Sequence, residues 1–104
     1  MNKSVTIDLI SKTYTTDSMG QRIPTEKATT VFATITSISR AEWTSYQQSG
    51  RVGFVPSYVA SVFMGDYNGE DIAEYEGKRY GIYRTFERDD EQVELYLEKK
   101  AGNE

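Results

Sequence analysis

Cysteine and histidine are absent from this 104-residue chain. Without cysteine, neither disulfides nor thiolate metal sites can hold the fold together, so stability must come from strand pairing and apolar packing. The additional lack of histidine excludes Ser/His/Asp and Cys/His triads and removes the usual ligands of zinc. These two absences eliminate the commonest catalytic and metal-binding arrangements.

Long apolar runs are absent as well. The first twelve residues, MNKSVTIDLISK, contain too short an apolar run for a signal peptide, and nowhere do about 18 consecutive apolar residues occur. We therefore expect a soluble chain, intracellular where it is made and without a membrane partner. The length fits a single domain spanning residues 1–104, and a hydrophobic content of 38% supplies one modest core.

Basic side chains are outnumbered by acidic ones in the last third of the chain. Residues 1–65 contain six basic and four acidic side chains, whereas residues 66–104 contain six basic and twelve acidic ones. Proteins that bind duplex DNA usually carry a basic face, because neutralised phosphates supply most of their affinity. The balance argues against tight DNA binding, although DNA could still pass nearby.

Strand-like alternation of polar and apolar residues dominates the first part of the chain. It begins over Ser4–Thr15 and returns over Lys27–Ser39, a run rich in β-branched residues. Between them, residues 16–20 have turn chemistry and Pro24 interrupts a second polar stretch. The sequence predicts two strands here, the second long and bent. The residues sharing one face are Val5, Ile7 and Leu9 in the first strand, and Val31, Ala33 and Ile35 in the second.

A short helix is predicted after the second strand. Ser39-Arg40-Ala41-Glu42 matches a capping box, in which the serine caps the third amide and the glutamate returns to the amide of the cap. About ten residues of helix follow, and Ser49-Gly50 ends them. So short a helix must dock on something. Trp43 and Tyr46 share a face at helical spacing, so we expect them to dock it on the β-core, with contact to a partner as the alternative.

The segment Gly50–Ser57, GRVGFVPS, combines glycines, a proline and apolar residues without periodicity. It is interpreted as a mobile loop that precedes a third strand over Tyr58–Met64. Exposed Phe54 between flexible flanks would cost solubility unless something covers it. Insertion into the core and contact with a subunit or ligand remain equal alternatives for this residue.

The last third of the chain predicts further strands joined by tight turns. Asn68-Gly69 is a turn signal before a strand over Asp71–Tyr75, and Glu76-Gly77 leads into a strand over Lys78–Phe86. A polar turn at 87–90 then precedes the last strand, Gln92–Lys99. With Glu76-Gly77 as a two-residue turn, Tyr75 opposes Lys78, Glu74 opposes Arg79 and Ala73 opposes Tyr80. Glu74 and Arg79 would then form a cross-strand ion pair.

Taken together, these patterns predict a mainly β fold. We expect a small antiparallel β-barrel with one short helix and a long loop between the second and third strands.

Two acidic clusters invite a chemical interpretation. The turn containing Asp66, Asn68, Glu70 and Asp71 crowds oxygens together, but its spacing does not fit an EF-hand calcium loop. Adjacent carboxylates at 89–91 would be needed by a carboxylate-dependent hydrolase, yet on a tight turn they point apart and stay solvated. We therefore expect no metal, no cofactor and no enzymatic activity.

Cations alternate with aromatic residues near the C-terminus, as in proteins that stack single-stranded nucleic acid on a small barrel. The acidic residues of the same segment would repel a phosphate backbone, so pairing of the arginines with nearby carboxylates is the favoured interpretation. A single-stranded nucleic-acid-binding module remains the alternative function. The residues concerned are Arg79, Arg84 and Arg88 with Tyr80, Tyr83 and Phe86.

The order of these segments resembles the head-closure, or head-tail joining, family of tailed bacteriophages. The resemblance rests on the turn with Gly20 and Pro24, the run to Ser39-Arg40-Ala41-Glu42, the Pro56-Ser57-Tyr58 approach, Asp66-Tyr67-Asn68-Gly69-Glu70, the hairpin Glu74-Tyr75-Glu76-Gly77-Lys78-Arg79-Tyr80, Ile82-Tyr83-Arg84-Thr85, and the acidic turn into Val93-Glu94-Leu95-Tyr96. It spans nearly the whole chain.

The resemblance implies a structural protein of the virion neck, present in the host cytoplasm during assembly. Such proteins form a ring, dodecameric by family expectation, beneath the portal and adaptor proteins, where they act as a stopper and as a platform for the tail-completion or tail-tube protein. Double-stranded DNA passes through without sequence recognition.

Carried over by position, the excursion that helps close the channel is 40–57. Its flexible part, which would contact the channel or neighbouring subunits, comprises Gly50, Arg51, Val52, Gly53, Phe54 and Val55.

Overall fold

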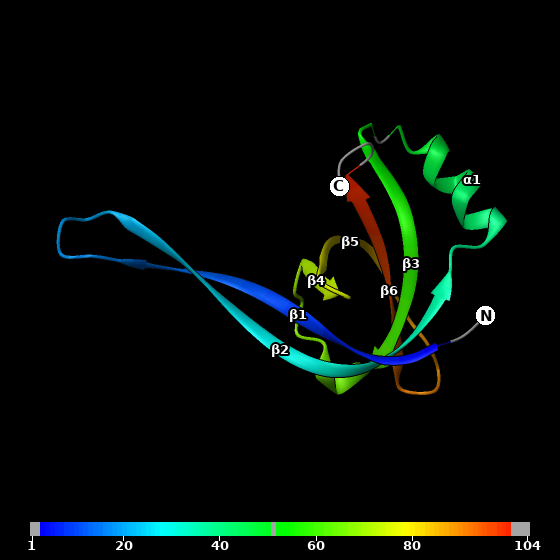
Figure 1. Cartoon of the computed structure of the whole chain (residues 1–104), viewed down its shortest axis with the longest axis horizontal. Helices are drawn as coiled ribbons and strands as arrows, with labels where there is room; N and C mark the ends of the chain where they lie inside the picture. Colours follow the sequence, from blue (N-terminus) through cyan, green and yellow to red (C-terminus); the bar gives the residue numbers. More distant parts are fainter. Residues whose placement is uncertain (1–2, 51, 101–104) are drawn as a thin grey trace.

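A computed structural model describes residues 3–50 and 52–100, and within these ranges six antiparallel strands close into a ring in the order β1-β2-β3-β6-β5-β4 (Figure 1). The predicted mainly β fold with one short helix is thereby confirmed. The elements are β1 Lys3–Thr16, β2 Arg22–Ser37, α1 Arg40–Gln48, β3 Phe54–Phe63, the 3₁₀ turn η1 Met64–Asp66, β4 Ile72–Tyr75, β5 Lys78–Glu87 and β6 Gln92–Lys100.

The core lies inside the ring of strands, where alternate residues of each strand meet. The predicted inward faces of β1 and β2 are confirmed, since Ile7, Leu9, Val31, Ala33 and Ile35 are buried and Val5 packs against them. The other core residues are Ala60, Val62, Ala73, Tyr75, Tyr80, Val93, Leu95 and Leu97. Burying these side chains is the main stabilising contribution in a chain without disulfides.

The hairpin of β1 and β2 is much longer than the sequence predicted. Its register runs without interruption from Lys3 opposite Ile35 to Thr16 opposite Arg22. The second strand therefore begins at Arg22 rather than Lys27. Pro24 does not interrupt it but lies within it opposite Tyr14. A proline is tolerated there because, among residues 3–50 and 52–100, no strand pairs with this part of β2 on its other side.

The predicted turn at 16–20 closes this hairpin. The Asp17 carboxylate accepts hydrogen bonds from the backbone amides of Met19 and Gln21, both at 2.9 Å. Gly20 has a φ of 84°, which glycine adopts without strain.

Two connections differ from the sequence prediction. The third strand begins at Phe54 rather than Tyr58, because Phe54, Val55 and Pro56 pair with the end of β6. The Asn68-Gly69 turn is present, with φ 86° at Gly69, but it does not join neighbouring strands. It leads instead from β3 to β4, which lie on different sides of the ring.

The predicted register of the β4–β5 hairpin is confirmed. Tyr75 opposes Lys78 and Glu74 opposes Arg79 across a turn whose two residues, Glu76 and Gly77, have φ of 53° and 78°. The predicted ion pair between Glu74 and Arg79 is wrong. Arg79 instead donates to both carboxylate oxygens of Glu26 on β2, at 2.7 and 2.9 Å, and such a two-point pair is among the stronger hydrogen-bonded contacts.

Candidate assembly surfaces

The helix α1 is docked on the outer face of β5 and β6 through Tyr46. Tyr46 is buried, and its hydroxyl donates to the carboxylate of Glu98 at 2.8 Å. Its ring also meets that of Tyr83 edge to face, at a centroid distance of 5.0 Å. Trp43 is 40% exposed and therefore less buried than Tyr46, so its part in docking the helix stays a prediction.

Glu42 and Tyr46, four residues apart, supply the hydrogen bonds that hold the helix on the sheet. Tyr83 donates its hydroxyl hydrogen to Glu42 at 2.8 Å, and Arg84 forms an ion pair with the same carboxylate. Trp43 lies about 60° from Tyr46 around a helix of 3.6 residues per turn, at the edge of the docked face. Burial, followed by the hydrogen bond to Glu42, raises the pKa of the Tyr83 hydroxyl.

Only one of the two hydrogen bonds of the predicted capping box is formed at the start of α1. The Ser39 hydroxyl accepts a hydrogen bond from the Glu42 amide at 3.1 Å, as predicted. The Glu42 carboxylate does not return to the cap, because it is engaged by Tyr83 and Arg84. The sequence predicted that Glu42 would cap its own helix, whereas in the fold its carboxylate contacts β5.

The segment predicted as a flexible loop is divided between loop and strand. Gly50 and Gly53 have φ of 79° and 87°, and Val52 between them is 86% exposed. Phe54 and Val55 belong to β3, so their assignment to the flexible loop is wrong. Arg51, the remaining residue of that prediction, lies outside the described residues.

The arginines near the C-terminus are paired with carboxylates. Arg79 binds Glu26 and Arg84 binds Glu42, while Arg88 lies 2.9 Å from Asp90. Tyr80 is buried in the core. The structure therefore confirms the favoured interpretation of these cations as structural partners.

The predicted oxygen-rich turn is used internally. Glu70 is buried, and its carboxylate accepts a hydrogen bond from the Asn68 amide at 2.8 Å. Tyr67 donates to the Glu70 carbonyl oxygen at 2.9 Å. Within residues 3–50 and 52–100, no cluster of three acidic side chains could hold a metal ion.

A projecting two-stranded ribbon, residues 11–29, is the largest feature that the sequence did not predict; we call it the arm (Figure 1). Pairing of β1 with β4 stops at Ile10, and pairing of β2 with β3 begins only at Ala33. Both edges of the arm are therefore unpaired among the described residues. Its exposed apolar side chains are Tyr14, Met19 and Ile23.

A signal for the arm is present in the sequence. The β-branched residues Thr13, Thr15, Ile23 and Thr25 continue the strand composition on both sides of the turn. Pro24 obscured it, because proline normally argues against a strand.

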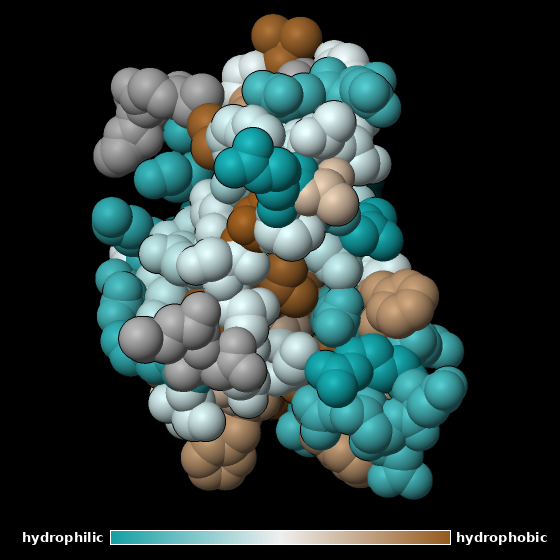
Figure 2. Space-filling view, turned by 90° about the vertical axis from the view of Figure 1, so that its right-hand side faces the viewer, coloured by the Kyte–Doolittle hydropathy of each residue, from teal (hydrophilic) through white to brown (hydrophobic). Residues whose placement is uncertain are grey.

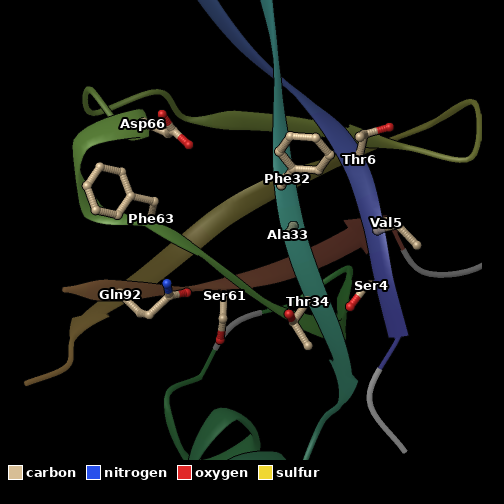
Figure 3. Close-up of a pocket in the computed structure, with 10 residues that line it drawn as sticks. All are labelled: Ser4, Val5, Thr6, Phe32, Ala33, Thr34, Ser61, Phe63, Asp66 and Gln92. Atoms are coloured by element: carbon tan, nitrogen blue, oxygen red, sulfur yellow. The ribbon is translucent and has the colours of Figure 1, made fainter. Parts of the chain in front are cut away.

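An open hollow of about 680 Å³ lies on the outer side of the strands, near the base of the arm. Figure 3 shows Phe32 of β2 and Phe63 of β3 on opposite sides of it, with the Asp66 carboxylate at one end. Phe32 is 80% exposed and Phe63 50% exposed. We call it the Phe32–Phe63 groove; its lining is Ser4, Val5, Thr6, Phe32, Ala33, Thr34, Ser61, Phe63, Asp66 and Gln92.

The face of the molecule turned away from the arm has a different character. In Figure 2 its apolar residues appear as small separate patches among hydrophilic ones. No helix in the described ranges is long and apolar enough to cross a membrane.

Compared with known proteins, the chain matches no family model, no curated protein and no solved structure.

Proposed function

We propose that this chain is a non-enzymatic structural protein of a bacteriophage neck. It joins the head connector to the tail as a subunit of an oligomeric ring, helps close the DNA channel and offers a platform on which the tail docks. The support is the resemblance of its segments to head-closure proteins, together with a closed ring of strands of the size expected for their small β-barrel.

The arm is the observation that carries the proposal. A two-stranded ribbon with both edges unpaired is marginally stable in water, and it contributes little to the core of its own chain. Exposed Met19 and Ile23 make it a poor solvent-facing element. Such an extension is useful to a protein that assembles, because contact with a neighbour covers its apolar side chains.

The channel-facing part of the proposed subunit is the excursion between β2 and β3. It consists of α1 and the short loop that follows, where Val52 is exposed between two glycines of positive φ. The contacts of Tyr46 and Glu42 hold the helix against the sheet. The loop is thus presented from a fixed base, as a stopper at the channel would require.

The excess of acidic residues in 66–104 is compatible with DNA that slides past the protein without binding it. Carboxylates that face a channel repel phosphates and leave the duplex free to slide, so no sequence recognition is involved. The proposed partners are the portal and adaptor proteins above and the tail-completion or tail-tube protein below. The proposed location is the virion neck, with the host cytoplasm as the place of assembly.

Addition of the purified chain to portal-adaptor complexes tests the proposal by electron microscopy. We expect extra ring density beneath the connector. Complexes that gain no density at saturating chain would contradict the neck role. Salt-dependent retention on a single-stranded oligonucleotide column would favour the nucleic-acid-binding alternative instead.

The channel assignment has a separate test in assembled virions. Val52→Asp should leave the ring intact and lower DNA retention, since a charge on the loop opposes apolar closure of the channel. Gln47→Asp, on the exposed side of α1, is the matched control. Full DNA retention with Val52→Asp would remove the loop from the closure mechanism without affecting the neck assignment.

A further inference from the structure

We infer that the arm of one copy of this chain docks in the Phe32–Phe63 groove of a second copy. The inference rests on the proposed ring and deepens it by naming the contact between neighbouring subunits. One surface projects and the other is hollow, so the contact is heterologous and propagates from copy to copy.

The arm cannot reach the groove of its own chain. The groove begins at Phe32, three residues beyond the base of the arm, and Figure 1 shows the arm continuing β1 and β2 outward, away from the ring of strands. The unbroken register of β1 and β2 holds the ribbon in that direction. Folding back would require these strand pairs to separate.

The dimensions suit a neighbour. Six residues of β1 beyond Ile10 extend about 20 Å at the rise of a strand. The molecule measures 51 × 32 × 24 Å, so its shortest dimension is close to the length of the arm. An arm lying across a second copy would therefore contact most of that copy's width.

The chemistry of the two surfaces is complementary. Tyr14 and Pro24 are directly opposed on one face of the arm, and the Arg22 guanidinium lies 4.4 Å from the Tyr14 ring on the same face. The groove offers the exposed rings of Phe32 and Phe63. The two phenylalanine rings of the groove can pack edge to face against the Tyr14 ring of the arm. They can also stack on the Arg22 guanidinium.

Charge supports the same pairing. The arm contains three cations and two carboxylates, a net charge of +1, so the rest of the chain, whose total is −4, has −5. Asp66 lies at one end of the groove. The acidic turn between β5 and β6 is held beside it, because the Met64 amide donates to the Glu91 carbonyl oxygen at 2.8 Å. Arg22 of an incoming arm thus meets carboxylates at this end of the groove.

Because the natural chain has no cysteine, chemical cross-linking gives a clean test. The double variant Met19→Cys/Ser61→Cys places one thiol at the arm tip and one in the groove. A short bismaleimide should convert it into a ladder of covalent dimers, trimers and longer chains or rings, both in concentrated solution and on portal-adaptor complexes. Met19→Cys/Lys99→Cys, with the second thiol at the far end of β6, should give little ladder.

Charge exchange tests the specificity of the contact. Arg22→Glu should lower the cross-linked fraction several-fold, and Asp66→Arg in the same chain should restore it, which a misfolded variant cannot do. Phe32→Ser/Phe63→Ser should also lower the fraction, whereas Trp43→Ser on the helix should not. Circular dichroism of each variant verifies that the fold is retained.

Four results would overturn the inference: absence of a ladder in both settings, rings on connectors that lack the Met19–Ser61 cross-link, equal ladders from the two thiol pairs, or dimers from Met19→Cys by itself. The last result would indicate an arm-to-arm contact. Rings on connectors without the Met19–Ser61 cross-link would reject the arm contact and leave the neck role intact. A ladder from a chain that adds nothing to connectors would reject the neck role alone.

Discussion

Buried polar contacts decide how the helix is held at the scale of single residues. Tyr46 and Glu98 are 52 positions apart in the chain, yet the phenol of one donates to the buried carboxylate of the other. Glu98 lies on the outer face of β6, next to inward-facing Leu97, and is 3% exposed beneath the helix. A carboxylate is buried only where hydrogen bonds compensate its lost hydration, so this contact ties the position of α1 to the sheet.

Tyr46→Phe tests how much the hydrogen bond between Tyr46 and Glu98 contributes to stability. The substitution keeps the ring contact with Tyr83 and removes the donor to a buried charged group, so it should lower the free energy of unfolding by about 1–3 kcal/mol. Urea unfolding followed by circular dichroism measures the change. Tyr14→Phe, on the exposed arm, is the matched control and should change stability by less than about 0.5 kcal/mol. Equal effects of the two substitutions would show that the Glu98 contact contributes nothing.

At the scale of elements, the arm and the closed ring of strands have different sources of stability. Inward-facing residues such as Leu9 and Leu95 are completely buried, whereas the arm has almost no buried side chain. Two hydrogen bonds from Arg79 of β5 to Glu26 connect the arm to the ring of strands, and they lower the pKa of the Glu26 carboxyl. The Arg79–Glu26 ion pair stabilises the fold when the pH is above the usual carboxylate pKa. This contribution is lost as the pH falls and Glu26 becomes protonated.

Shortening the arm should therefore leave the rest of the fold intact. Replacing residues 13–25 by Asn-Gly makes Lys12 and Glu26 the closing pair of a two-residue hairpin, a role suited to Asn-Gly. We expect the free energy of unfolding to change by less than about 1 kcal/mol, because no core side chain is removed. Chemical denaturation measures it.

The contrasting variant is Leu9→Ala in the full-length chain. It removes a fully buried side chain and should cost about 2–5 kcal/mol. An arm-shortened chain that unfolds as readily as Leu9→Ala would show that the arm is part of the folding unit.

Four partly buried tyrosines make the stability of the whole molecule depend on alkaline pH. The pKa values of Tyr67, Tyr80, Tyr83 and Tyr96 are all raised above the ordinary value for a phenol, in each case chiefly by burial. Carboxylates add to the shift at Tyr83 and Tyr96, through hydrogen bonds with Glu42 and Glu94. The folded chain thus retains these phenol protons to higher pH than the unfolded chain does.

Stability should consequently fall in alkali. A raised folded-state pKa contributes stability that is complete below the unfolded pKa of about 10 and is lost as pH rises through the folded value. We expect the urea midpoint to hold up to about pH 9, to drop as the pH rises above about 10, and to drop less in Tyr83→Phe. Trp43→Phe, which removes no ionisable group, should keep the full drop. A midpoint independent of pH across this range would contradict the shifts.

Local patterns in the sequence were sufficient for much of the fold. Alternation identified the buried faces of β1 and β2, and Glu76-Gly77 set the register of β4 and β5. The Ser39 cap was found correctly as well. These features depend on residues a few positions apart, whose conformational preferences act before any tertiary contact forms.

The tertiary structure alone decided the features on which assembly is proposed to depend. Arg79 is paired with Glu26 rather than with Glu74, and Glu42 with Tyr83 rather than with its own cap, because these partners approach only when the ring of strands closes. The Phe32–Phe63 groove likewise needs strands from distant parts of the chain. Pro24 was interpreted wrongly as a break between strands. A proline fits a strand where no adjacent strand requires its missing amide hydrogen, and the sequence does not show which strands are adjacent. Sequence determined which residues form strands, turns and core; the closing of the sheet determined which charges meet and which edges and aromatic rings remain exposed.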